Sequence, residues 1–161
     1  MTPVDKAVLD SLSTGIQGEL AAYVFYKKAM KIVRDLNLVS VLARLAIEEK
    51  SHYQILEGQY DSLVRSEMWN TLSDVLRREG LPDIEEKMET VHESFIDELT
   101  DGTPSLRVLE MALFLEERAF NLYTGFAQKT ENTNGRRMYE QLARFESAHI
   151  IKVKNMMENL K

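Results

Sequence analysis

Apolar residues recur at steps of three and four over four long stretches of the chain, as in helices that bury one face. In the first stretch these positions are Val8, Leu9, Leu12, Ile16, Leu20, Tyr23, Tyr26 and Met30. The pattern predicts helices over about residues 4–34, 38–65, 104–130 and 135–160, with Thr2 as the first N-cap. The predicted fold class is therefore all-α, with the whole chain, residues 1–161, forming one domain.

Turn-forming residues separate the predicted helices. Asp35–Asn37 and Asn132–Gly135 are short breaks, so the helices on either side of each break should form a hairpin. Residues 66–103 would connect the two hairpins as a long, partly helical crossover. Within it we expect a short helix that ends at Gly80 and a second helix over residues 84–99.

The two predicted hairpins carry the same polar motif on their apolar faces. A lone glutamate is followed thirty residues later by Glu-x-x-His, and an offset of 97 residues relates the two copies. The same offset relates Tyr26 to Tyr123, so the sequence contains an internal repeat. The motif residues are Glu19, Glu49 and His52 in the first copy and Glu116, Glu146 and His149 in the second.

The spacing of this motif predicts a metal site. A continuous helix would separate residues thirty apart by about 45 Å, but each break lies midway, so each hairpin brings its lone glutamate level with its Glu-x-x-His. Two hairpins packed as a four-helix bundle would enclose four carboxylates and two imidazoles. An apolar core does not tolerate these charges without compensation, and two divalent cations would balance them. Carboxylate with imidazole suits iron or manganese, and zinc less selectively.

The alternative is that these side chains lie on exposed helix faces. One Glu-x-x-His is a weak signal, but two copies at matched spacing favour a site. Glu48 and Glu117 adjoin the motif residues, and we expect both to be solvated because the offset selects Glu49 and Glu116 instead. We expect His92 to lie on the surface, and Trp69 to anchor the crossover against the bundle or a second subunit.

The amino-acid composition argues against several classes of function. The chain is 44% apolar and 29% charged, as is typical of soluble globular proteins, with a net charge of −6. It has no Lys/Arg-rich run, which argues against a nucleic-acid partner. The absence of cysteine excludes thiolate zinc sites, cysteine nucleophiles and iron–sulfur or rubredoxin-type centres built from this sequence. No apolar run is long enough to span a membrane, and we expect a cytoplasmic protein.

The motif set resembles that of the ferritin-like di-iron and di-manganese carboxylate proteins. Within them it looks most like the rubrerythrin type, here without a rubredoxin domain. The resemblance implies a ferritin-like four-helix bundle that binds two Fe ions, with Mn or a mixed Fe/Mn pair as alternatives. It implies that Glu49 and Glu146 bridge the metals and that Tyr26 and Tyr123 hydrogen-bond ligand carboxylates. The remaining ligands, one carboxylate and one imidazole for each metal, would be Glu19, Glu116, His52 and His149.

Two departures from the rubrerythrin pattern bear on the activity. Ala119 stands where peroxidase-active rubrerythrins usually carry an extra carboxylate, and no cysteine is available for a rubredoxin-like iron. The six remaining ligands resemble the ferroxidase centre of bacterioferritins. The resemblance thus implies a non-haem di-iron protein that reacts with H2O2 or O2, a peroxidase, oxidase or ferroxidase in oxidative-stress defence or iron handling.

Two alternatives to this activity stay open. The first is a non-catalytic protein for iron binding, storage or sensing, and the second is a di-iron oxygenase that acts on an organic substrate. The expected partners are an external electron donor, if the protein is catalytic, and a second copy of the chain in a homodimer.

Overall fold

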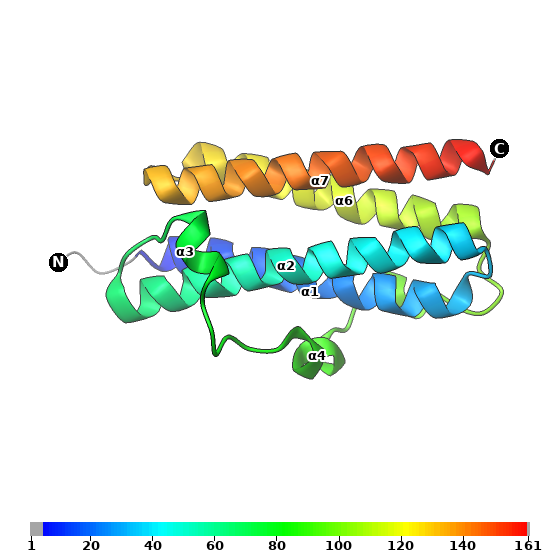
Figure 1. The fold of residues 1–161 in the computed structure, drawn as a ribbon, viewed down its shortest axis with the longest axis horizontal. Helices are drawn as coiled ribbons and strands as arrows, with labels where there is room; N and C mark the ends of the chain where they lie inside the picture. The colour runs from blue at the N-terminus through cyan, green and yellow to red at the C-terminus, as the bar shows by residue number, and fades with distance from the viewer. Residues whose placement is uncertain (1–4, 161) are drawn as a thin grey trace.

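The computed structural model describes residues 5–160, and in this range every regular element is a helix. The predicted all-α class is confirmed: the chain forms a ferritin-like four-helix bundle (Figure 1). The four long helices are α1 (Lys6–Ile32), α2 (Leu36–Ser66), α6 (Ser105–Lys129) and α7 (Thr133–Asn159). The crossover contains α3 (Leu72–Leu76), α4 (Ile84–Lys87), the 3₁₀ helix η1 (Met88–Thr90) and α5 (Ser94–Asp97).

Side-chain caps set the ends of the long helices. Asp35 accepts a hydrogen bond from the Leu38 amide at 3.0 Å, so α2 begins at Leu36 and the break comes two residues earlier than predicted. Asn132 accepts from the amides of Asn134 and Gly135 and starts α7 in the same way. Asp5 caps α1, and the predicted cap Thr2 lies outside the described residues.

The chain direction explains the long crossover. Helices α1 and α2 pack side by side and antiparallel, as do α6 and α7 (Figure 1). Helix α2 ends at the end of the bundle opposite to the one where α6 begins, so the crossover follows the whole length of the bundle. A helix the length of α1 spans about 40 Å, a distance that a short loop cannot cover. The apolar faces of the four long helices form the core between the two hairpins.

The predicted single helix over residues 84–99 is wrong. The backbone is extended at Val91 and Glu93, and these residues separate η1 from α5. Ile84 and Ile96 are both buried. Twelve residues of continuous helix would turn these side chains about 120° apart, so the interruption lets both face the bundle. Lys28 holds α5 by donating to the Ile96 carbonyl at 2.8 Å.

Trp69 anchors the start of the crossover against the bundle. A Cβ atom added to Gly135 would lie 2.9 Å from the Trp69 ring and 2.9 Å from Thr130 Cγ2. The Trp69 ring also meets Tyr139 edge-on, with ring centroids 6.3 Å apart. The lack of a side chain at Gly135 therefore allows the crossover to pack on the first turn of α7.

Replacing Gly135 with alanine should destabilise the fold by about 1–3 kcal/mol, because the new methyl group overlaps the indole ring. Gly125→Ala is the matched control, since Gly125 lies within α6, four residues before its end, and a Cβ there meets nothing within 4 Å. The control should stabilise the fold by about 0.5–1 kcal/mol. Denaturant unfolding of the two variants measures both changes, and equal stabilities would contradict the proposed packing.

No described helix is long and apolar enough to cross a membrane.

Candidate metal centre

The structure brings all six predicted motif residues together in the core of the bundle. Their ligand atoms form two groups, and within each group all atoms lie within 4.8 Å of one another. Glu49 and Glu146 belong to both groups, and every one of the six residues is at most 4% exposed. The first group is Glu19, Glu49, His52 and Glu146, and the second is Glu49, Glu116, Glu146 and His149.

Both histidines present Nδ1 to the carboxylates. His52 Nδ1 lies 2.9 Å from Glu146 Oε1, and His149 Nδ1 lies 3.2 Å from Glu116 Oε2. The two imidazole rings are stacked, with centroids 5.6 Å apart and planes inclined by 18°. Each ring therefore offers one nitrogen to the cluster and turns the other, Nε2, outward.

Buried carboxylate oxygens without hydrogen-bond partners indicate that these side chains fit metal cations as ligands. Glu19 Oε2, Glu49 Oε1 and Glu146 Oε2 are buried without a hydrogen-bond partner. Glu49 Oε1 lies only 2.9 Å from His149 Nδ1, but the two are not aligned as a hydrogen bond. Buried carboxylate oxygens are costly to leave unpaired, and carboxylates with imidazoles are ligands of iron, manganese and zinc.

The metal-free cluster balances its charge internally. Burial alone would raise the pKa of Glu19, but a hydrogen bond with Glu49 and the charge of His52 bring that pKa down to about 2. Burial also opposes ionisation of Glu116, whose pKa is nevertheless lowered by its hydrogen bonds with Glu146 and His149. Burial together with the neighbouring carboxylates raises the pKa of Glu49 and of Glu146 well above the ordinary value.

The histidines supply the positive charge in this state. Burial alone would lower the pKa of His52, but the Glu19 charge and the hydrogen bond with Glu146 raise it well above its ordinary value. The pKa of His149 is raised in the same way, against its burial, by the carboxylates of Glu116 and Glu146. The raised pKa values of both histidines thus favour positive charge beside the ionised forms of Glu19 and Glu116.

Two tyrosines tie the hairpins together at the cluster. Tyr26 on α1 donates to Glu116 Oε1 on α6 at 2.5 Å, and Tyr123 on α6 donates to Glu19 on α1. All four side chains are buried. Each tyrosine thus holds the lone glutamate of the opposite hairpin, which fixes the orientation of a carboxylate that only one of the two groups contains.

Glu48 is not a free surface carboxylate, contrary to the expectation from the sequence. Its Oε2 lies 2.5 Å from His149 Nε2, and its side chain is 39% exposed. The offset of 97 pairs Glu48 with Phe145, which stacks on His52 with ring centroids 5.2 Å apart. The internal repeat could not predict this contact, because one copy has a glutamate at this position and the other has a phenylalanine. Glu117, also expected to be solvated, is exposed, as is His92.

Replacing Glu48 with alanine should weaken the binding of one metal ion more than that of the other. A carboxylate that accepts from the outer nitrogen of a ligating histidine orients the ring, and its loss typically costs about 10–100-fold in metal affinity. We expect about a tenfold loss for the ion at His149 and little change at His52, which stacks on Phe145. Calorimetric metal titration resolves the two steps, with Glu117→Ala as the control. Equal weakening of both steps would contradict the asymmetry.

A small cavity of about 30 Å³ adjoins the cluster. Carboxylates Glu19, Glu49, Glu116 and Glu146 line it, together with small and apolar side chains that include Ala22, Leu115, Ala119 and Leu122. This volume holds roughly one water-sized molecule.

The fold and the site define a class of protein. A four-helix bundle that combines a glutamate from each of two helices with Glu-x-x-His from each of the other two has the architecture of the ferritin-like carboxylate proteins. Residues 107–161, which include most of α6 and all of α7, match the family model of rubrerythrin. The fold is therefore that of a ferritin-like four-helix bundle, and the C-terminal third of the chain is similar to rubrerythrin.

A solved structure has a similar fold. It is a hypothetical protein from Pyrococcus furiosus, with a TM-score of 0.66 and 19% sequence identity over 93% of this chain and 87% of that chain. At this identity the likeness concerns the fold alone. No curated protein matches the sequence significantly.

Proposed function

We propose that the protein binds two iron ions in this cluster and consumes hydrogen peroxide or dioxygen there. The observation that carries the proposal is the pair of buried ligand groups that share Glu49 and Glu146. Four ionised glutamates around two divalent cations give a neutral site in which both histidines are uncharged ligands. The rubrerythrin match over residues 107–161 supports an iron pair over other metals.

The side chains of the protein have separate tasks in this proposal. Glu49 and Glu146 would hold both ions, while Glu19 with His52 and Glu116 with His149 would complete one coordination sphere each. When bound, the iron ions supply one electron each to the oxidant. Tyr26 and Tyr123 keep the lone carboxylates oriented through their hydrogen bonds, and burial of the whole cluster keeps bulk water away from it.

The size of the cavity beside the cluster favours a small oxidant over an organic substrate. A volume of about 30 Å³ is close to the scale of a small oxidant such as H2O2 or O2 and is far below that of an organic substrate, for which an oxygenase needs room. Ala119 lines this cavity at the position of the extra rubrerythrin carboxylate. The six-ligand set therefore supports iron oxidation with either oxidant in preference to turnover of the rubrerythrin peroxidase kind.

Stopped-flow absorbance tests the proposal. The chain is loaded anaerobically with two Fe(II) ions and mixed with H2O2 or with O2. We expect Fe(II) to oxidise at least about tenfold faster than in buffer, which corresponds to a barrier lowered by roughly 1.4 kcal/mol or more. Loaded Glu117→Ala should match the unmodified chain. Stoichiometric iron binding without faster oxidation would replace the proposal with the non-catalytic iron-binding alternative.

We further propose two partners for the protein, an external electron donor and a second copy of the chain. Without cysteine the sequence offers no rubredoxin-type centre, so repeated turnover would need an external electron donor. The second partner is another copy of the chain in a homodimer, which would cover exposed apolar side chains of the long helices such as Ile47, Phe114 or Ile151. Sedimentation of the full chain would distinguish a dimer from a monomer.

A further inference from the structure

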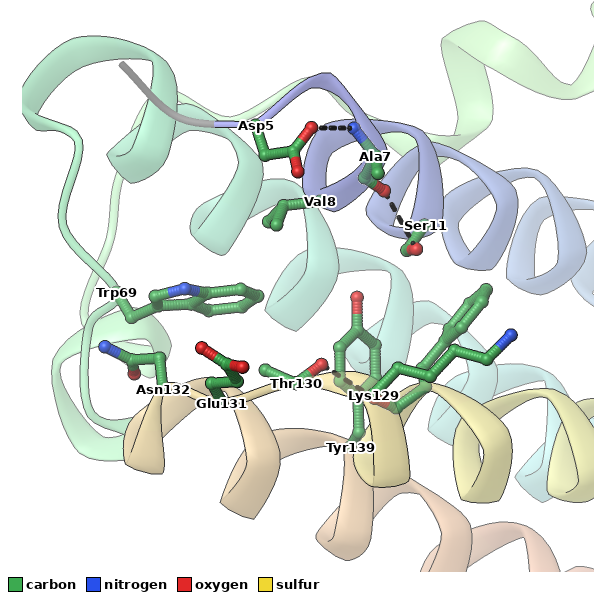
Figure 2. Close-up of a pocket in the computed structure, with 11 residues that line it drawn as sticks. Asp5, Ala7, Val8, Ser11, Trp69, Lys129, Thr130, Glu131, Asn132 and Tyr139 are labelled. Atoms are coloured by element: carbon green, nitrogen blue, oxygen red, sulfur yellow. Dashed lines mark hydrogen bonds between the residues drawn. The ribbon is translucent and has the colours of Figure 1, made fainter. Parts of the chain in front are cut away.

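A second, larger cavity lies away from the metal cluster, between the start of α1 and the turn that joins α6 to α7. Its volume is about 500 Å³. Figure 2 shows the Trp69 ring on one side of it, Val8 at its α1 side and Tyr139 rising from α7 into its inner part. Phe126 adds a third aromatic side chain to the wall. This much aromatic surface suits a planar apolar molecule.

Tyr139 is the exceptional residue in this wall. Its side chain is 1% exposed, and among residues 5–160 its hydroxyl is the one buried tyrosine hydroxyl without a hydrogen-bond partner. By contrast, the hydroxyls of Tyr26 and Tyr123 each donate to a carboxylate. Burial raises the pKa of Tyr139, so its hydroxyl keeps the proton and is available as a donor. A buried donor without an acceptor needs an explanation.

Several other polar groups of the wall have partners within the protein. Asp5 accepts from the Ala7 amide, the Ser11 hydroxyl donates to the Ala7 carbonyl and the Thr130 hydroxyl donates to the Phe126 carbonyl. The charged side chains on the rim are Asp5, Glu131 and Lys129, which do not add up to a positive surface. A strongly anionic ligand is therefore disfavoured, and the buried Tyr139 hydroxyl calls for an acceptor oxygen.

We propose that this cavity binds a small uncharged quinone, whose ring packs between Trp69 and Phe126 and whose carbonyl oxygen accepts a hydrogen bond from the Tyr139 hydroxyl. A quinone meets each requirement of the wall: it is planar and apolar over most of its surface, it has no charge, and it carries the acceptor that the site lacks. The walls are held in place, since Trp69 packs on Gly135 and meets the Tyr139 ring edge-on.

The position of the cavity gives such a ligand a connection to the metal cluster. The Tyr139 ring stacks on the Tyr123 ring with centroids 6.2 Å apart and planes inclined by 24°. The Tyr123 hydroxyl in turn donates to Glu19. Two tyrosine rings in contact thus join the floor of the quinone site to a carboxylate of the metal cluster.

Calorimetric titration of the metal-depleted full chain with 1,4-naphthoquinone tests the proposal, with the fluorescence of Trp69, the one tryptophan of the sequence, as a second readout. The absence of cysteine removes covalent thiol adducts as a complication. We expect one site per chain with a dissociation constant of about 10–100 µM, in keeping with a ligand of this size, and quenching of Trp69. Tyr139→Phe should bind about three- to tenfold more weakly, the effect of one hydrogen bond.

Two controls separate the proposed hydrogen bond from general apolar binding. Tyr60→Phe, outside the cavity, should bind like the unmodified chain, and Tyr139→Phe should melt at the same temperature or higher because its lost hydroxyl had no partner. Naphthalene, which lacks the oxygen, should bind the unmodified chain as weakly as the quinone binds Tyr139→Phe. No binding at 500 µM quinone, the same affinity for Tyr139→Phe, or tight naphthalene binding would each overturn the proposal. Since the titration needs no metal, its result is independent of whether the iron centre functions.

Discussion

Replacing Glu146 with glutamine should abolish tight binding of the metal pair and leave the chain folded. The raised pKa of Glu146 favours the neutral form of this side chain in the absence of metal, and an amide of the same shape reproduces that form. With metals bound, the same amide removes one of the two carboxylates that both ligand groups share. A pair of divalent cations would then carry an uncompensated buried charge.

The expected size of the effect is large. Losing a histidine's outer carboxylate costs about 10–100-fold in metal affinity, so losing a shared ligand should cost at least about 100-fold for each ion. Metal analysis after desalting should fall from roughly two ions per chain, the number that this ligand set holds, to one or none. The melting temperature of the metal-free variant should stay close to that of the unmodified chain. Two retained ions would contradict the assignment of Glu146.

Glu19→Gln provides the contrasting variant. Glu19 is ionised in the metal-free cluster and stabilises the charged His52, whose Nδ1 lies 3.6 Å from its Oε1. Removing one partner of a buried charge pair typically costs about 3–5 kcal/mol, so this variant should be destabilised even without metal. Glu117→Gln, on the exposed face next to Glu116, should change neither stability nor metal content.

The repeat in the sequence predicted the long helices and the identity of the clustered side chains. Spacings of three and four residues fix which face of a helix is buried, and the breaks fix where each hairpin turns. The ends of the long helices differ from the predicted ends by about two residues at most, within the usual uncertainty of boundaries. The shift at Leu36 came from a cap, since Asp35 could be interpreted as part of a turn or as the residue that starts the next helix.

Contacts between the hairpins were not predictable from the repeat. The Glu48 carboxylate reaches His149 from the other hairpin, and which of two neighbouring glutamates turns inward depends on the packing of four helices. The same holds for Tyr139, because nothing in the sequence indicates that its hydroxyl lacks a partner. In the crossover, the burial of both Ile84 and Ile96 overrode the helical pattern.

Loading the metal-free chain with two divalent cations should release about four protons per chain. The pKa values of Glu49, Glu146, His52 and His149 are all raised, so these four groups keep their protons to higher pH than ordinary side chains do. Metal ligation requires the deprotonated forms of carboxylate and imidazole. Glu19 and Glu116, whose pKa values are lowered, are already ionised and release none.

This proton release determines how metal binding and stability depend on pH. Because the four groups must lose protons, the apparent affinity for the metal pair should fall by up to about four powers of ten for each pH unit of acidification below their raised pKa values. The stability of the metal-free fold should change in the opposite direction and fall as the pH rises. A group whose pKa is raised in the folded chain stabilises the fold fully at any pH below its pKa in the unfolded chain, which is near 4.5 for a glutamate and 6.5 for a histidine. This stabilisation is lost as the pH rises through the pKa of the group in the folded chain.

Glu19 and Glu116, whose pKa values are lowered, affect the stability of the fold at low pH. The stabilisation that they contribute is lost as the pH falls through their pKa values in the folded chain. The metal-free chain should therefore be most stable in mildly acidic solution, and the gain in melting temperature on metal loading should grow from pH 6 to pH 8. Calorimetry at pH 6.5 in two buffers of different ionisation enthalpy counts the protons. Release of fewer than about one proton per chain would mean that the metal-free site is not neutralised by its own histidines and shared glutamates, and the charge balance inferred for the cluster would be wrong.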